Sequence, residues 1–360
     1  MKILVLGFAK LKIMPYMNFY LENIDRKKND VHLLYWNRDL KKEDQTKYSD
    51  LIFHEFKYYQ EDEVKKWKKV KSFCAYRKFA LNVIDSYQFD FIIVLHSLPG
   101  LLVLDRLVNK YSGKFILDYR DSTYETFYPF KKLVNVLIKH SKCTFTSSDA
   151  FRIYFSSKYT YKIFTSHNVL NDALNHREYK RVKSSKIRVA FWGMIRHEEI
   201  NKILIERLGN DLRFELHYYG REQNIALALK EYVSKNKYTN IFFHGEYNPE
   251  DRYEFVKNTD IIHNIYLDTN TQLAMGNKFY DGIIFRIPQV CMVESYMGTL
   301  CQKYGIGVAI NPNLQNFADL LYDYYSALDM KTFDVNADRV LQKVLSEYNT
   351  GVNLIKDIFI

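Results

Sequence analysis

The 360-residue sequence has few cysteines and no long apolar run. Its four cysteines form no C-x-x-C pair, which excludes a zinc ribbon and a thioredoxin motif; they are Cys74, Cys143, Cys291 and Cys301. Free thiols in a reducing compartment are therefore expected. No segment approaches the roughly 18–20 apolar residues of a transmembrane helix, and residues 2–6 predict a first strand rather than a signal peptide. We expect a cytoplasmic protein that touches the inner face of the plasma membrane at its surface only.

Several short catalytic and binding motifs are missing as well. The turn Gly7-Phe8-Ala9-Lys10 lacks the second and third glycines of G-x-G-x-x-G, which disfavours NAD and FAD. The sequence contains no P-loop, no H-E-x-x-H and no G-x-S-x-G motif. A D-x-D clamp for a metal and a diphosphate is absent too, because Asp118 and Asp121 are three residues apart. We therefore expect no bound metal.

The composition is that of a globular protein with more than one core. Hydrophobic residues make up 47% and charged residues 26% of a chain too long for one ordinary domain. The net charge of +10 favours an acidic partner, such as nucleic acid, an anionic membrane or a phosphorylated small molecule. We find no zinc finger and no basic-aromatic RNA-binding signature, so nucleic acid is not expected. A non-catalytic basic binding protein stays an alternative.

Short apolar runs alternate with helical patterns twice along the chain, which predicts two parallel α/β domains. The first half has predicted strands at 2–6, 30–35, 50–56, 89–95, 114–117, 143–146 and 161–165. The second half has them at 187–192, 213–219, 240–244, 260–266 and 289–293. We expect an N-terminal domain over 1–170, a polar linker over 171–186 and a C-terminal domain over 187–335. A last helix over 336–360 is expected to pack back on the N-terminal domain.

Three strands of the second half end in glycine, at Gly193, Gly220 and Gly245. Ligands of parallel sheets bind at the carboxyl ends of strands. Arg196 follows the first of these glycines, and arginine suits bidentate contact with phosphate oxygens. The alternative for Arg196 is a surface ion pair with Glu198 or Glu199.

The stretch from Gly276 to Gly282 predicts a helix that begins at Asn277. A helix N-terminus has unpaired N–H groups and the positive end of the helix dipole, which suit a phosphate. Lys278 adds a cation, and Asp281 could accept hydrogen bonds from sugar hydroxyls on the same face. The pattern favours a nucleotide diphosphate. The more common alternative is a capped helix with an exposed Lys278–Asp281 pair.

Two further loops and one helix carry candidate residues. In the first half, Asp121 and His96 follow predicted strands, where either could take a proton from an acceptor hydroxyl. The alternative is that Asp118 and Asp121 cap the next segment and pair with Arg120, and that His96 is structural.

Residues 63–74 combine five lysines with an apolar stripe, which is typical either of a membrane-surface helix or of an ordinary solvated one.

These motifs together resemble the retaining, two-domain GT-B glycosyltransferases of the group 1 (family 4) class, which builds capsules and exopolysaccharides. In the second half the resemblance rests on Gly193 with Arg196, Gly220, Phe243-His244-Gly245, Thr259-Asp260-Ile261-Ile262, and Asn277-Lys278-x-Tyr280-Asp281-Gly282 with Pro288. The first half is similar more loosely, through Leu117-Asp118-Tyr119-Arg120-Asp121 and His167-Asn168.

The resemblance implies two Rossmann-like domains facing across a cleft, and a metal-independent hexosyltransferase. Its donor is a nucleotide-diphosphate sugar, most often a UDP-sugar, and no further cofactor is implied. Asp281 matches the acid that holds the ribose, and Arg196 with Lys278 would neutralise the diphosphate. The implied donor-site residues are Gly193, Arg196, Gly220, Gly245, Gly276, Asn277, Lys278 and Asp281. Asp121 and His96 lie on the side of a lipid-linked or saccharide acceptor, and Asp121, His96 and Arg196 are the catalytic candidates.

One position departs from the family pattern. A second acid normally stands eight residues before the ribose acid and touches the donor sugar, but Leu273 stands there in this chain. This leaves open the sugar, the retention of configuration and activity itself. A nucleotide-sugar epimerase of the same fold is an alternative.

Overall fold

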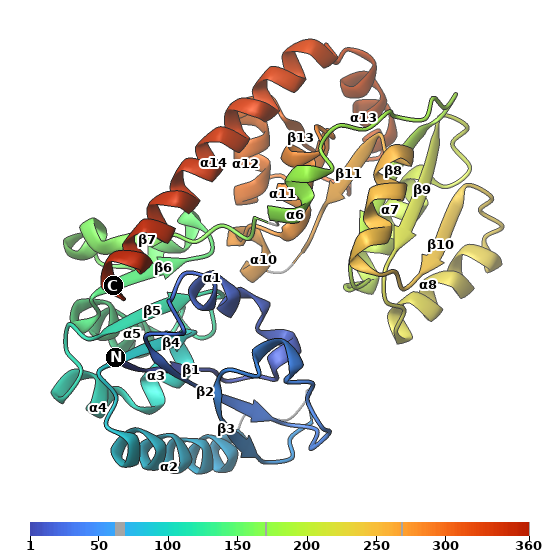
Figure 1. Cartoon of the computed structure of the whole chain (residues 1–360). Coiled ribbons are helices and arrows are strands. Elements are labelled where there is room, and N and C mark those ends of the chain that lie inside the picture. The colour runs from blue at the N-terminus through green and yellow to red at the C-terminus, as the bar shows by residue number, and fades with distance from the viewer. Residues whose placement is uncertain (62–68, 170, 268, 360) are drawn as a thin grey trace. The chain divides into compact units, whose positions relative to one another are not determined.

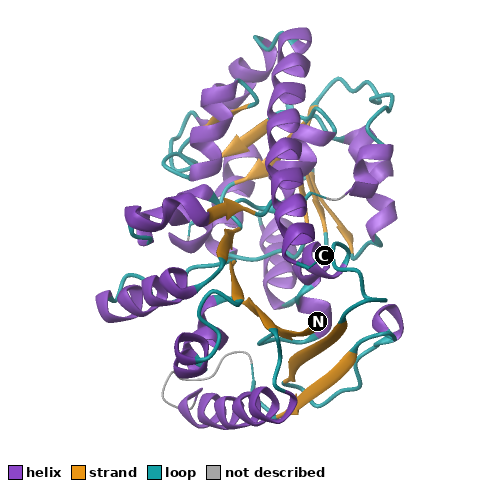
Figure 2. Ribbon diagram, turned by 60° about the vertical axis from the view of Figure 1, so that its left-hand side comes forward, coloured by secondary structure: helices purple, strands orange, loops and turns teal. Residues whose placement is uncertain are grey.

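The computed structural model describes residues 1–61, 69–169, 171–267 and 269–359. The chain divides into two compact units (Figure 1). Unit 1 comprises residues 1–167 and 346–360, and unit 2 comprises residues 168–345. In both units the strands are flanked by helices (Figure 2).

Unit 1 contains a seven-stranded sheet in the order β3-β2-β1-β4-β5-β6-β7. All of its pairings are parallel. Because helices cover both faces of such a sheet, central strands are continuous apolar runs, and all five residues of β4 are buried. The strands are β1 (Lys2–Leu6), β2 (Asp30–Asn37), β3 (Ile52–Lys57), β4 (Phe91–Leu95), β5 (Phe115–Tyr119), β6 (Cys143–Thr146) and β7 (Ile163–Thr165).

The helices of unit 1 are α1 (Asn18–Leu21), α2 (Lys69–Tyr87), α3 (Ser97–Leu102), α4 (Leu104–Asn109) and α5 (Tyr128–His140). In α2 the buried residues Tyr76, Ala80, Val83 and Ile84 recur at helical spacing and face the sheet. Helices α3 and α4 are separated at Val103, which adopts φ −117° and ψ 23°. The first six residues of the expected membrane helix over 63–74 lie outside the described residues, and its last six belong to α2.

Unit 2 contains a six-stranded parallel sheet in the order β10-β9-β8-β11-β12-β13. Its strands are β8 (Ile187–Trp192), β9 (Phe214–Tyr219), β10 (Ile241–Gly245), β11 (Ile261–Asn264), β12 (Gln289–Cys291) and β13 (Gly307–Ala309). Its helices are α6 (Asn171–Asn175), α7 (Glu198–Leu208), α8 (Asn224–Lys235), α9 (Arg252–Phe255), α10 (Thr269–Leu273), α11 (Asn277–Ile284), α12 (Tyr296–Tyr304), α13 (Phe317–Ser326) and α14 (Met330–Ile358).

Two apolar cores cover the two faces of this second sheet. Successive side chains of a strand point to opposite faces, so Val189 and Phe191 of β8 enter one core while Ala190 and Trp192 enter the other. Helices α7, α8 and α13 pack on the first face, and α11, α12 and α14 on the second. This alternation places Trp192, the last residue of β8, beside α11.

Residues 171–186, the expected linker, are held along unit 2. Arg177 Nε donates to the carbonyl of Ile284 at 3.0 Å, and the Tyr179 hydroxyl donates to that of Phe285 at 2.8 Å. The final helix α14 begins at Met330 and runs from unit 2 into unit 1. There the Phe359 ring packs edge-on against Phe91 of β4, with centroids 5.1 Å apart.

Candidate functional site

A pocket of about 300 Å³ lies within unit 2, where β8 ends and α11 begins. Such a position, at the carboxyl ends of parallel strands, is where α/β sheets bind ligands. The pocket brings together six of the residues proposed from the sequence, which are Gly193, Arg196, Gly276, Asn277, Lys278 and Asp281.

Glycine allows three strand ends to approach one another beside this pocket. The N–H of Gly193 donates to the carbonyl of Tyr219 at 2.8 Å, and the N–H of Gly220 donates to that of Gly245 at 2.8 Å. A Cβ on Gly220 would lie 1.7 Å from the Gly193 carbonyl oxygen, so no larger residue fits without moving the backbone. Gly220 and Gly245 are not among the pocket's described lining residues, and Gly220 instead permits the close approach of these strand ends.

Helix α11 points its N-terminus into the pocket. Gly276 precedes it with φ −73° and ψ 154°, and the Gly276 carbonyl accepts from Phe279 N–H at 3.0 Å. The first N–H groups of a helix have no partner within it. The exposed Asn277 accepts a hydrogen bond on Oδ1 from Asn168 Nδ2 at 3.3 Å. The helix therefore presents N–H donors and a polar side chain to a ligand.

The Asp281 carboxylate lies at the base of the pocket and is 3% exposed. Its Oδ2 accepts from Trp192 Nε1 at 2.8 Å, and its Oδ1 lies 3.2 Å from a terminal nitrogen of Arg252. Burial raises the pKa of Asp281, while Arg252 and then Trp192 act in the opposite direction. Each oxygen retains a second lone pair, so the carboxylate can still accept from a hydroxyl.

Lys278 is also buried, at 8% exposure, and its ammonium faces aromatic rings. Its Nζ lies 4.1 Å from the ring centroid of Phe191 and 5.2 Å from that of Tyr266. No carboxylate of the described chain forms an ion pair with it. Lys278 and Asp281 are thus not the exposed pair that one alternative expected. A buried cation without an ion-pairing carboxylate is costly unless an anion binds beside it.

Arg196 lies at the rim of the same pocket and is exposed. In the described part of the chain its guanidinium makes no ion pair, and Glu198 instead binds Lys202 at 2.6 Å. The turn that carries Arg196 is fixed by Asn201, whose Nδ2 donates to the carbonyls of Arg196 at 2.6 Å and His197 at 3.0 Å. The backbone of His197 is left-handed, with φ 61°. This turn therefore places an exposed cation at the rim of the pocket that the buried Lys278 also lines.

The other two catalytic candidates lie in unit 1. His96 follows β4 with the left-handed value φ 84°, and its N–H donates to the carbonyl of Asp118 at 2.7 Å. Burial lowers the pKa of His96, whereas the Asp121 carboxylate raises it. Asp118 forms a buried ion pair with Arg120 at 2.9 Å, and Asp121 is exposed. His96 lines a separate pocket of about 250 Å³, and Asp121 is not among that pocket's described residues.

Sequence reasoning missed Trp192 and Arg252, the two donors that hold Asp281. Trp192 carried a weak signal, because a buried indole N–H at a strand end needs an acceptor. Arg252 carried none, since it begins α9 and lies 29 residues before Asp281. Two tyrosines that line the pocket, Tyr247 and Tyr266, were missed too.

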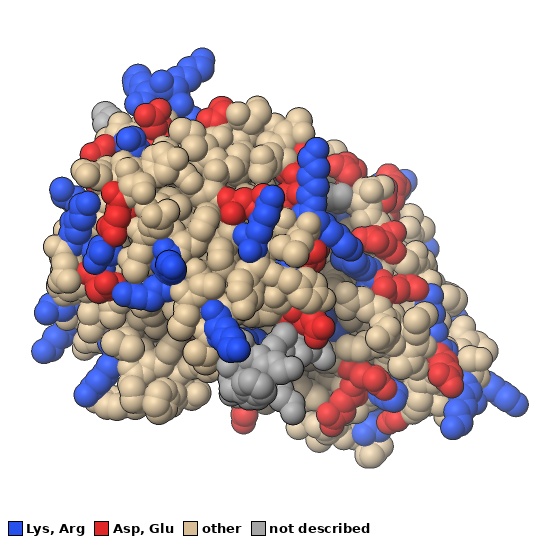
Figure 3. Space-filling view, turned by 90° about the horizontal axis from the view of Figure 1, so that it is seen from below, with Lys and Arg blue, Asp and Glu red and all other residues tan. Residues whose placement is uncertain are grey.

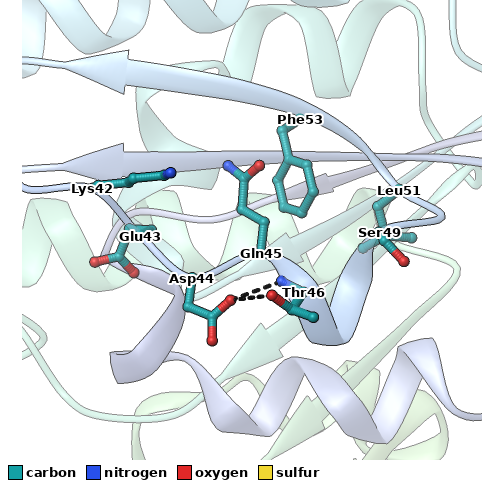
Figure 4. Close-up of a pocket in the computed structure, with 8 residues that line it drawn as sticks. All are labelled: Lys42, Glu43, Asp44, Gln45, Thr46, Ser49, Leu51 and Phe53. Carbon is teal, nitrogen blue, oxygen red and sulfur yellow. Dashed lines mark hydrogen bonds between the residues drawn. The ribbon is translucent and has the colours of Figure 1, made fainter.

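A larger hollow of about 610 Å³ lies in unit 1 beside β3 (Figure 4). No residue proposed from the sequence lines it. Its Asp44 accepts from the N–H of Thr46 at 2.9 Å and from the Thr46 hydroxyl at 2.6 Å, as in an ordinary turn.

On the face in Figure 3, basic and acidic side chains are interspersed among the described residues, without one continuous basic strip.

No family model and no curated protein matches this sequence. Solved structures match over nearly the whole chain. Sucrose-phosphate synthase from Thermosynechococcus elongatus has a TM-score of 0.73 at 9% identity, covering 99% of this chain and 98% of its own. Anabaena HepE, in complex with UDP and glucose, has a TM-score of 0.67 at 11% identity, with 99% of each chain covered. A putative UDP-N-acetylglucosamine 2-epimerase from Listeria monocytogenes has a TM-score of 0.58 at 10% identity, covering 94% and 90%.

These matches extend over both units and establish the GT-B fold, with one Rossmann-like parallel sheet in each unit. The fold expected from the sequence motifs is therefore confirmed. Within the described residues, no helix has the length and apolar character that crossing a bilayer requires.

Proposed function

We propose that this chain is a glycosyltransferase that takes a sugar from a UDP-sugar and transfers it to a lipid-linked or saccharide acceptor. The Lys278 ammonium carries the proposal. It is buried, faces the same pocket as Arg196 and Asp281, and has no carboxylate partner in the described chain. A diphosphate would supply the missing negative charge. HepE, which shares the fold, was solved with UDP.

Each group in the pocket has a role in this reaction. The bond between the sugar's anomeric carbon and the diphosphate breaks, and negative charge develops on the leaving UDP. Lys278, Arg196 and the N-terminus of α11 stabilise that charge. Since these groups already supply the positive charge, we propose that the reaction is metal-independent. Asp281, oriented by Trp192 and Arg252, accepts hydrogen bonds from the ribose hydroxyls.

The acceptor side of the proposal rests on unit 1. An imidazole whose pKa is lowered by burial is neutral near pH 7 and can accept a proton from an attacking hydroxyl. We therefore assign this role to His96, with Asp121 as the neighbouring carboxylate.

The resemblance adds retention of configuration and a role in capsule or exopolysaccharide synthesis. It also adds a cytoplasmic location at the inner membrane face, with residues 63–74 as the membrane contact.

Thermal unfolding with UDP-, GDP- and ADP-sugars tests the donor site. A ligand at a hundred times its Kd stabilises the folded state by about 2.7 kcal/mol, which is easily measured. We expect UDP-sugars to raise Tm and the other two to do so less. If no nucleotide sugar changes Tm, the pocket is not a donor site.

An epimerase is the second candidate, because the Listeria monocytogenes protein described as a putative UDP-N-acetylglucosamine 2-epimerase shares the fold. The two activities differ in whether they need an acceptor. Incubation with a UDP-sugar alone should leave the sugar unchanged if the chain is a transferase. An epimerised sugar in that sample would favour the epimerase, and nucleotide binding without either product would favour a non-catalytic binding protein.

A further inference from the structure

The pocket of about 250 Å³ in unit 1 has a composition that suits an acidic ligand. It lies where β1, β2, β3, β4 and β5 end, the edge at which parallel sheets bind ligands. The segments that follow these strands, together with the first turns of α2, supply its lining. Its volume is slightly below the usual range for small-molecule pockets, which limits the occupant to about one sugar ring.

Two cations line this pocket, Arg38 after β2 and Lys69 at the start of α2. No aspartate or glutamate is among its described lining residues. The Arg38 guanidinium is held in place, because its terminal nitrogen donates to the carbonyl of Phe8 at 3.2 Å and its carbon lies 4.4 Å from the Trp36 ring centroid. A pre-positioned guanidinium loses little entropy on binding an anion.

Aromatic rings form another part of the wall. Phe8 and Phe73 lie with centroids 5.5 Å apart, and Tyr124 also lines the pocket. Aromatic faces beside fixed polar groups suit a sugar ring, which has an apolar face and a polar edge. His96, the proposed proton acceptor, lines the same pocket.

We infer that this pocket binds the acceptor through an acidic group on a sugar ring, either a carboxylate or a phosphate. This inference rests on the proposed sugar transfer, since it names the acceptor of that reaction. Arg38 and Lys69 bind the anion, the aromatic wall contacts the ring, and His96 faces the hydroxyl that attacks.

Calorimetric titration with three small probes tests the inference, with UDP present to occupy the donor site. The probes are methyl glucuronoside, glucose phosphate and neutral methyl glucoside. We expect at least one acidic probe to bind about tenfold more tightly than methyl glucoside, as a charge-assisted hydrogen bond implies. Preference for the glucuronoside indicates a uronic acid, and preference for the phosphate indicates a phosphorylated sugar.

Matched variants locate the binding. Lys69→Gln should weaken the acidic probe about tenfold, whereas Lys78→Gln makes the same charge change on the exposed face of α2 and should not. Arg38→Gln should act like Lys69→Gln, with circular dichroism to verify its fold. The inference is overturned if no acidic probe binds, if methyl glucoside binds equally well, or if the two lysine variants agree.

The same samples separate this inference from the proposed function. UDP titrated into the Lys69→Gln variant should bind as it does to the parent, because Lys69 belongs to unit 1 and the donor pocket lies in unit 2. Normal UDP binding with no acidic probe bound refutes only the inference. If the acidic probe still binds but UDP does not, only the proposal of a UDP-sugar donor is refuted.

Discussion

Replacing Lys278 with methionine should weaken nucleotide binding without unfolding unit 2. Methionine keeps the length and apolar contacts of the side chain, which lies 4.1 Å from the Phe191 ring centroid and 5.2 Å from that of Tyr266. It removes only the charge. No described carboxylate forms an ion pair with that charge, and its electrostatic effect on the pKa of Asp281 is smaller than those of Arg252 and Trp192.

The expected sizes of the two effects differ. A hydrogen bond to a charged group contributes about 1.5–3 kcal/mol, so UDP affinity should fall about 10- to 150-fold. For the ligand-free protein, the lost cation–π contact costs about 0.5–2 kcal/mol. Relief of a buried charge acts in the opposite direction. The free energy of unfolding should therefore change by no more than about 1 kcal/mol.

Calorimetry with UDP and urea unfolding of the ligand-free variant measure both effects. Lys303→Met is the control, because Lys303 is exposed on α12 of the same unit. It should change neither quantity. A Lys278→Met protein that binds UDP like the parent but unfolds several kcal/mol more easily would refute the reasoning, because Lys278 would then be a structural residue.

Three further predictions concern the surroundings of this lysine. Arg252→Met should raise the pKa of Asp281 further, since Arg252 opposes the effect of burial. As the pH is lowered from 8 to 5, the UDP affinity of this variant should therefore begin to fall at a higher pH than that of the parent. An unchanged pH profile would contradict the ion pair. Gly220→Ala should destabilise the protein by about 2–4 kcal/mol in urea unfolding, because its Cβ would lie 1.7 Å from the Gly193 carbonyl oxygen. Gly245 has φ 82°, but no atom lies within 4 Å of a Cβ built on it, so Gly245→Ala should cost only about 1 kcal/mol of stability. If the two alanine variants lost the same stability, close approach would not explain the glycine at position 220. His263 is buried without a hydrogen bond on either ring nitrogen, and burial lowers its pKa to about 3. The folded state therefore stays unprotonated where the unfolded state takes a proton, so stability falls as pH drops below about 6.5. Between pH 6.5 and 5, His263→Phe should lose about 2 kcal/mol less stability than the parent, and parallel curves would contradict this.

The strands were predictable because parallel strands are buried on both faces. A short continuous apolar run between turn residues, such as that of β4, is typical of such a strand. The three-residue strand β13 was missed, because its sequence Gly-Val-Ala contains only one residue that favours strands.

The site was predictable only where its residues are local in sequence. The spacing in α11 predicted that Lys278 and Asp281 share a face, but it could not tell burial from exposure. Their burial depends on β8 and α9, and the donors to Asp281 come from 89 and 29 residues away. The strand-end glycines were expected to contact the nucleotide. Gly220 instead lies so close to the Gly193 carbonyl oxygen that a side chain there would collide with it.

The departure at Leu273 separates nucleotide recognition from sugar recognition. Asp281 is the only carboxylate among the described lining residues of the donor pocket, and Trp192 and Arg252 already hold it. Near Leu273 the pocket is lined instead by neutral residues, Thr271 and Ala274. Neutral groups discriminate between hydroxyl patterns less strongly than a fixed carboxylate, because charged hydrogen bonds are about twice as strong. Tight UDP binding would therefore establish the nucleotide site without establishing transfer, and the sugar must be identified from the product.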